Sequence, residues 1–319
     1  KFGSYTGSGS SGKVVTTGFR PAFVMVKRTT GEPWAIADST RNPLNPTRWE
    51  LYANNDDADY ETGGVGVVNM TDTGFTIQAT AGQWNASGGS YIYMAFAGGM
   101  DSISDYNDTG SIDSRVKAST TYGQSIVKYT GSGSTGTVGH GLTTAPNMTM
   151  VKCTSEDGGD WKVQHTGLSD GNKVLYLNST ATEQDESDKF GAFAGATTFP
   201  LNGSHASVNG SGKSYIAYCF HDVAGYSKFG TYSGSGSTQT ITLGFKPAFL
   251  MIKSKSYAGS WTMWDNTRSP TNPVTKMLIP HASGAEETKT DREPSFISTG
   301  FSIGDSDADT NKNGETYIY

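Results

Sequence analysis

Two Asp–Arg pairs are the first residues that could bind a polar ligand. Asp38 lies three residues before Arg41, and Asp265 lies three residues before Arg268. A carboxylate beside a guanidinium can hold a polar ligand, but the same spacing also lets an Asp close a turn and pair with the Arg. The corresponding place in the middle of the chain is His165, which argues against a shared catalytic role. We therefore interpret both pairs as structural turn pairs.

The six tryptophans offer a different chemistry, because aromatic faces stack on sugar rings. Trp34, Trp161 and Trp261 recur at one place in three similar stretches of sequence, which favours burial in a core over a sugar-stacking platform. The others do not recur and, if exposed, are candidates for a ligand-binding surface. They are Trp49, Trp84 and Trp264.

One acidic run could bind a cation. Asp305, Asp307 and Asp309 alternate with small residues, and such carboxylates can converge on calcium. The run lacks the glycine of a sharp bend and a spaced bidentate Glu, so a hairpin loop is the favoured interpretation. The sequence predicts no bound metal and no cofactor.

Catalytic groups are not visible as a recurring set. The five histidines lie in different contexts without a repeated acidic neighbour, and no nucleophile stands with a base. Cys153 and Cys219 lie in predicted strands of one stretch, where buried reduced thiols are favoured over a bridge. We therefore expect a protein that is not an enzyme.

The elements that position these residues repeat three times. Tyr5-Thr-Gly-Ser-Gly-Ser10 returns from Tyr129 and, with one change, from Tyr232. A Lys follows in each copy, and a Trp follows the Lys at a nearly fixed distance. The repeats define a domain organisation. The predicted boundaries are repeat 1 at 1–97, a linker or short capping excursion at 98–122, repeat 2 at 123–222 and repeat 3 at 223–319.

The periodicity within each repeat indicates strands. Residues 23–26 and 249–252 are apolar at every position, as in central strands covered on both faces. Residues 74–77 and 300–303 alternate, as half-buried strands do. Gly-Ser and Asn-Gly turns separate the runs at short intervals. The sequence predicts an all-β protein of three tandem antiparallel β-sandwich, jelly-roll-like domains.

Composition excludes several classes. Thirty acidic against 24 basic residues gives a net charge of -6, without the basic excess that phosphate contacts require, so no nucleic-acid partner is expected. No apolar run is long enough to span a membrane, so no membrane insertion is expected. The apolar fraction is only 34%. Because such small domains would need partner surface to complete a core, we expect a homo-oligomer, with a trimer as the favoured form.

The motifs resemble a repeat domain of structural proteins of tailed bacteriophages. The resemblance rests on KFGSYTGSGS, GFRPAFVMVKRT and NASGGSYIYMAFA in repeat 1, and on YGQSIVKYTGSGS and SGKSYIAYCFHDVAGYSKFG further on. It implies a virion or extracellular location, other virion proteins as partners, and a truncated third repeat.

The predicted function is a non-enzymatic structural component of a phage virion, such as a tail-fibre segment. The alternative is a carbohydrate-binding adhesin or receptor-binding module that recognises host cell-surface polysaccharide. The sequence does not identify the host, the ligand or the position along the particle.

Overall fold

β-Strands dominate the structure. The computed structural model describes residues 1–64, 66–98, 105–304 and 306–319. Within these residues the strands form separate antiparallel sheets, and the helical content is the single turn α1 (Gly82–Asn85). The all-β class and the antiparallel pairing predicted from the periodicity are confirmed.

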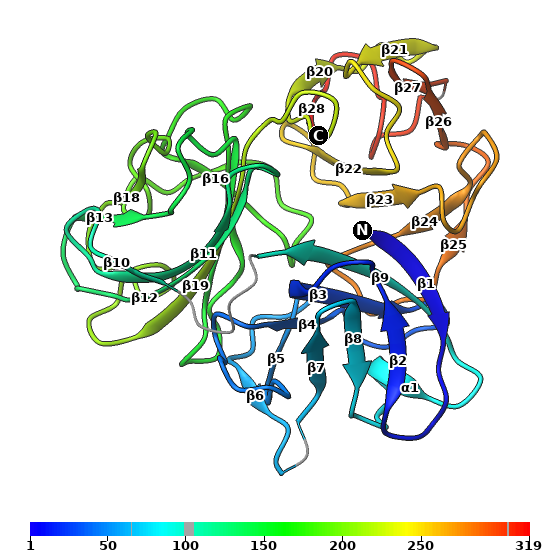
Figure 1. Cartoon of the computed structure of the whole chain (residues 1–319). Helices are drawn as coiled ribbons and strands as arrows, with labels where there is room; N and C mark the ends of the chain where they lie inside the picture. The colour runs from blue at the N-terminus through cyan, green and yellow to red at the C-terminus, as the bar shows by residue number, and fades with distance from the viewer. Residues whose placement is uncertain (65, 99–104, 305) are drawn as a thin grey trace.

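Three bodies surround a common centre (Figure 1). Repeat 1 is blue to cyan, repeat 2 is green, and repeat 3 runs from yellow to red. Each body contains one large sheet and one smaller sheet. The large sheets share one strand order, in which the first strand of the repeat pairs with its last strand.

Repeat 1 has a six-stranded and a three-stranded sheet. In order, the large sheet contains β1 (Phe2–Thr6), β9 (Ser90–Ala97), β3 (Pro21–Arg28), β4 (Ala35–Asp38), β5 (Trp49–Tyr52) and β6 (Tyr60–Glu61). The small sheet contains β2 (Lys13–Thr16), β8 (Gly74–Ile77) and β7 (Val68–Thr71).

Repeat 2 has an eight-stranded and a two-stranded sheet. The large sheet contains β10 (Asp105–Asn107), β11 (Ser114–Ser119), β12 (Gln124–Thr130), β19 (Ser214–Phe220), β14 (Met148–Cys153), β15 (Lys162–His165), β16 (Lys173–Tyr176) and β17 (Gln184–Asp185). The small sheet contains β13 (Gly136–Gly139) and β18 (Thr198–Leu201).

Repeat 3 has the same sheet sizes as repeat 1. The large sheet contains β20 (Thr231–Ser233), β28 (Thr316–Ile318), β22 (Phe249–Ser254), β23 (Thr262–Asp265), β24 (Lys276–Leu278) and β25 (Glu287–Thr288). The small sheet contains β21 (Gln239–Thr242), β27 (Gly300–Ile303) and β26 (Pro294–Ile297).

The segment predicted as a linker contains two strands of the large sheet of repeat 2. β10 and β11 pair with each other, and β11 pairs with β12 from Ser114 opposite Tyr129 to Ser119 opposite Gln124. The linker prediction was wrong at these residues because the only aliphatic side chains from 105 to 119 are Ile112, Val116 and Ala118, so long-range pairing determines the conformation. Residues 99–104 of the predicted linker lie outside the described residues.

A buried Asn in each repeat holds the Gly-Ser-Gly-Ser turn. Asn85 accepts a hydrogen bond from the Ser8 backbone N–H at 2.7 Å and donates to the Ser10 carbonyl at 2.7 Å. The same two bonds tie Asn209 to Ser132 and Ser134, and Asn311 to Ser235 and Ser237. The repeated motif is therefore a side-chain clamp on a tight turn. In repeat 3 the clamping residue is Asn311.

Each repeat has its own core and a share of a central one. The faces of the large and small sheets of a repeat enclose one apolar cluster, which in repeat 1 contains Val24 and Val26. The opposite faces of the three large sheets form a fourth cluster, to which β3 contributes Phe23 and Met25. The prediction that residues 23–26 are covered on both faces is confirmed, because β3 lies between two cores.

Candidate functional site: the interfaces between the repeats

The recurring tryptophan of each repeat lies at an interface. All three indoles are nearly fully buried in the central cluster. Each indole Nε1 donates a hydrogen bond to a backbone carbonyl of another repeat. The acceptor is the last residue of β5 or β16, or the residue directly after β24. The bonds join Trp34 to Ile279 (2.9 Å), Trp161 to Tyr52 (3.0 Å) and Trp261 to Tyr176 (2.8 Å).

The recurring lysine forms a second set of bonds. Each side chain is fully buried, and each Nζ donates to a backbone carbonyl four residues after the one that accepts from the indole. Burial lowers the pKa of Lys27 and of Lys253 to about 8. The bonds join Lys27 to Ser283 (2.9 Å), Lys152 to Asp56 (3.0 Å) and Lys253 to Thr180 (3.3 Å).

Backbone groups form the third set. In each interface an N–H three residues further along donates to the carbonyl two residues after the lysine. The bonds run from Asp59 to Thr154 (3.0 Å), from Glu183 to Lys255 (2.9 Å) and from Glu286 to Thr29 (2.7 Å).

These three sets make the interfaces equivalent and cyclic. Repeat 2 donates its indole and lysine to repeat 1, repeat 1 donates to repeat 3, and repeat 3 donates to repeat 2. An interface of this head-to-tail type generates a closed ring when its rotation closes. One chain therefore forms a pseudo-threefold ring of its own repeats.

The Asp–Arg pairs lie beside these interfaces and close turns. Asp38 accepts the backbone N–H groups of Thr40 (3.0 Å) and Arg41 (2.8 Å), and its other oxygen pairs with Arg41 Nε. Arg41 also pairs with Asp59, and Tyr218 from repeat 2 donates to Asp38 at 2.8 Å. Burial raises the pKa of Asp59. The hydrogen bonds of this cluster serve the turn and the interface.

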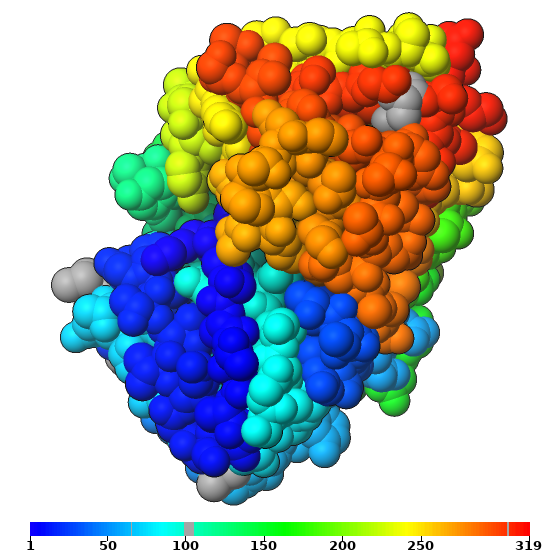
Figure 2. Space-filling model, turned by 90° about the vertical axis from the view of Figure 1, so that its right-hand side faces the viewer, coloured from blue at the N-terminus to red at the C-terminus, as the bar shows by residue number. Residues whose placement is uncertain are grey.

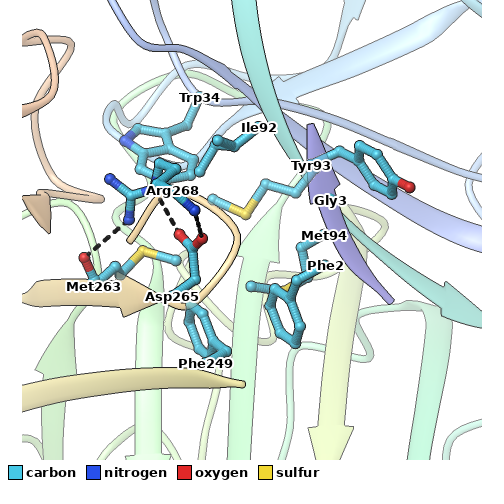
Figure 3. A pocket seen from close by; sticks show the side chains of 11 residues that line it. Phe2, Gly3, Trp34, Ile92, Tyr93, Met94, Phe249, Met263, Asp265 and Arg268 are labelled. Carbon is cyan, nitrogen blue, oxygen red and sulfur yellow. Dashed lines mark hydrogen bonds and ion pairs between the residues drawn. The ribbon is translucent and has the colours of Figure 1, made fainter. Parts of the chain in front are cut away.

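The equivalent pair in repeat 3 has a different neighbour. Asp265 pairs with Arg268 in the same way, and Arg268 pairs with Glu286. The residue at the position of Tyr218 is Met94, whose thioether carries no donor. A small pocket remains between repeats 1 and 3, with Trp34 and Met94 in its lining (Figure 3).

His165 occupies the Asp position in repeat 2. Its Nδ1 accepts the Gly167 N–H at 2.9 Å, and its Nε2 lies 3.3 Å from the Tyr319 carbonyl of repeat 3. Burial lowers the pKa of His165 to about 4, so the ring is neutral near pH 7. It closes the same turn without a charge.

The tryptophans singled out as surface candidates are not a shared surface. Trp84 and Trp264 are fully buried, so neither has the exposed ring that a ligand-binding surface requires. Trp84 Nε1 donates to Glu50 at 2.6 Å inside repeat 1, and Trp264 belongs to the core of repeat 3. Trp49 is half-buried on β5.

An arginine lies where the calcium candidate would need its cation. Asp307 and Asp309 each pair with Arg292 at 2.9 Å. Asp305, the third candidate, lies outside the described residues. Among the residues that are described, no three His, Cys, Asp or Glu side chains are grouped as a metal site.

Cys153 and Cys219 are buried free thiols. Cys153 lies opposite Tyr215 in the ladder of β14 and β19, four residues from Cys219. Four strand residues span roughly 13 Å, which is too far for a disulfide.

The interface could be foreseen only in part. The Lys and Trp that donate the bonds were visible in the sequence as recurring residues, but only burial of the Trp was predicted. The acceptors are backbone carbonyls, and the residues that accept from the lysines, Asp56, Thr180 and Ser283, differ in type, so their side chains carried no signal.

Comparisons with known proteins add a family. A family described as a domain of unknown function matches residues 1–99 and 101–319. No curated protein and no solved structure matches the chain. In the part of the chain that the structure describes, no helix has the length and apolar character needed to cross a membrane.

Proposed function

Because the chain belongs to the DUF7483 family, whose function is unknown, we propose its role from its geometry. We propose a non-enzymatic structural component of a tailed-bacteriophage virion, as a segment of a tail fibre or a similar extracellular fibre. In this proposal the three repeats are tandem antiparallel β-sandwich, jelly-roll-like domains.

The observation that carries the proposal is the closed ring. Nine hydrogen bonds in three equal sets and one shared apolar cluster join the repeats. Because the indole and lysine donors are buried, their hydrogen bonds leave the repeats little freedom to move relative to each other. Such rigidity suits a load-bearing part of a fibre.

The surface supports the same role. The exposed Gly-Ser-Gly-Ser turns are clamped by buried asparagines, and protease cleavage is favoured at loops that open. We therefore expect the folded chain to resist proteolysis at these turns, although they lie on the surface.

The low apolar fraction suggested a trimer of chains, and the ring changes the reason for expecting one. The surfaces that complete the core come from the other two repeats of the same chain. A trimer of chains, with other virion proteins as partners, rests on the fibre resemblance alone. Light scattering tests it, since a 33.8 kDa particle at all concentrations would exclude it.

Immunogold electron microscopy of purified particles tests the virion location. Antibodies raised against the chain should label the tail or its fibres. Chain that is abundant in lysates but absent from purified particles would overturn the proposal.

One observation favours the alternative, a module that binds host surface glycans. Tyr122 and Tyr226 come from different loops and are 45% and 44% exposed, with ring centroids 5.0 Å apart. Two adjacent exposed aromatic faces can stack on a sugar ring. This pair replaces the tryptophans as the candidate glycan surface.

A glycan array tests the alternative. Signal that Tyr226→Ala removes and Tyr60→Ala leaves would support it, because Tyr60 is a 58% exposed tyrosine on β6, outside this pair. An array without signal for the unmodified chain would exclude it. A reducing-end assay on any bound polysaccharide checks that the chain does not cleave it.

A further inference from the structure

A buried amine and a carboxylate lie in contact in repeat 2. Lys162 of β15 is buried, and its Nζ lies 3.4 Å from Oε2 of Glu186. The chain between the two residues passes through β16 and β17, so folding brings them together. The pair is particular to repeat 2. In the other repeats the residues at these two positions are Ala35 with Thr62, and Thr262 with Lys289.

The two carboxyl oxygens of Glu186 have different surroundings. Oε1 accepts a hydrogen bond from the Tyr176 hydroxyl at 2.6 Å, and Nζ of the buried Lys189 lies 3.7 Å from the same oxygen. Both groups stabilise negative charge on Oε1 and polarise the carboxyl carbon. Oε2 is buried and has no hydrogen-bond partner among the described residues. An oxygen without a hydrogen bond is the one whose loss costs the fold least.

Lys162 has the surroundings of a nucleophilic amine. Its Nζ lies 3.9 Å from the centre of the Tyr176 ring and 3.7 Å from Oδ2 of Asp160. Burial lowers the pKa of Lys162, which raises the fraction of neutral amine. Asp160 is held by Asn178, whose Nδ2 donates to Oδ1 at 2.9 Å, so Oδ2 is placed to accept a proton from the amine.

We propose that Lys162 and Glu186 condense to an intramolecular amide bond. Lys162 Nζ attacks Cδ of Glu186, and Oε1 carries the negative charge of the tetrahedral intermediate beside Tyr176 and Lys189. A C–N bond forms, and the bond from Cδ to Oε2 breaks. The two protons that the ammonium group loses pass through Asp160 to Oε2, which leaves as water. The reaction needs no oxidant and no other reactant.

The surroundings favour the amide over the ion pair. A buried ion pair carries the desolvation penalty of both charges, whereas the amide carries no charge. The amide carbonyl is Oε1, which keeps its hydrogen bond from Tyr176, while Oε2 leaves. Two reacting groups that are held in contact have an effective concentration of roughly 10⁵ M or more. We therefore expect the folded chain to form the bond without an added enzyme.

The bond connects the two segments through which repeat 2 contacts its neighbours. Trp161, which precedes Lys162, donates to repeat 1, and Glu183, three residues before Glu186, donates to repeat 3. Repeats 1 and 3 also contact each other, as Figure 2 shows for the blue-to-cyan and yellow-to-red parts of the chain. The amide therefore fixes the two interface segments of repeat 2 to each other. This inference does not depend on the virion role.

Mass spectrometry of the full chain, folded and then denatured, tests the proposal. The mass should be one water below that of the sequence. Trypsin should cut after Lys173 and leave residues 153–173 joined to residues 174–189. The joined peptides have two amino termini, which distinguishes them from an uncut linear peptide. A mass equal to that of the sequence after prolonged incubation would overturn the proposal. A water loss without joined peptides, as a succinimide at Asp157 would give, would also overturn it.

Variants assign the roles of the groups. Lys162→Arg keeps a cation at the site but removes the amine, so its mass should equal that of its sequence. Lys173→Arg is the matched control and should keep the water loss, because Lys173 pairs with Asp185 at 3.0 Å on the surface. Asp160→Asn should slow the reaction about tenfold or more.

Water loss that persists in Lys162→Arg would overturn the assignment of the amine, and an unchanged rate in Asp160→Asn would overturn the proton path. The mass of the unmodified chain decides the proposal even where a variant does not fold.

Discussion

At the scale of residues, the buried lysines are the least ordinary feature of the chain. A buried ammonium usually pairs with a carboxylate, yet Lys27 donates to carbonyl oxygens of its own loop and of repeat 3. Lys152 and Lys253 do the same at the other two interfaces. Desolvation lowers the pKa of all three lysines. Each lysine fixes the orientation of one repeat relative to the next, because its ammonium group donates to a carbonyl of that repeat.

The recurring indoles should be among the most costly side chains to remove. Trp161→Ala leaves a cavity in the central cluster and an unpaired carbonyl at Tyr52, so we expect a loss of about 3–5 kcal/mol in unfolding free energy. Urea denaturation measures it. Trp49→Ala, at a half-buried site, is the matched control and should cost about 1 kcal/mol. Equal losses would contradict the interface role.

His165 should make the ring sensitive to acid. Its pKa is about 4 in the folded chain against 6.5 for the free side chain, so between these values the unfolded chain binds more protons. The stabilising contribution is complete above pH 6.5 and is lost as pH falls to 4, by about 3 kcal/mol. Denaturation midpoints from pH 7 to pH 4 should decline less in His165→Gln. An equal decline in both proteins would show that other groups control this range.

At the scale of elements, the sequence predicted strands best where both faces are covered. Every position from Phe23 to Val26 is apolar, because one face of β3 packs in repeat 1 and the other in the central cluster. β11 could not be foreseen, since its few apolar side chains gain their environment only through pairing with β12. The direction of the interfaces was also hidden, because backbone carbonyls accept the bonds whatever their side chains are.

β11 should behave as part of the core despite its polar sequence. Val116 is buried in the cluster of repeat 2, so Val116→Ala should cost about 1–2.5 kcal/mol. Arg115→Ala, at the exposed neighbouring position, should change little. Hydrogen exchange at Ile126 and Lys128 of β12 should accelerate in the first variant alone. Unchanged exchange would show that the pairing of β11 does not protect the edge of β12.

At the scale of the whole molecule, the shared cluster joins the repeats into one cooperative unit. Repeat proteins that contact only sequence neighbours lose cooperativity along the array, but here repeats 1 and 3 are also neighbours through Trp34 and Ile279. Separate domains joined by linkers would unfold independently. The ring arrangement replaces the extended array that tandem repeats first suggest.

Calorimetry should therefore show a single thermal transition with equal calorimetric and van't Hoff enthalpies. We expect Trp34→Ala to lower its midpoint by several degrees while keeping one transition, or to split repeats 1 and 3 from each other. Three resolved transitions in the unmodified chain would show that the repeats fold independently and that the central cluster contributes little.

The closed ring has a consequence for how its surface can diversify. In a ring of three identical chains every substitution is displayed three times. Here each repeat carries its own residues, so β10 and β11 flank one repeat and Val14 has a threonine in its place in repeat 3. The arrangement of the sheets is pseudo-threefold, whereas surface features such as β10 and β11 occur once per chain. A partner that contacts features common to the repeats could bind at three similar sides, whereas a partner that contacts β10 or β11 would bind once per chain.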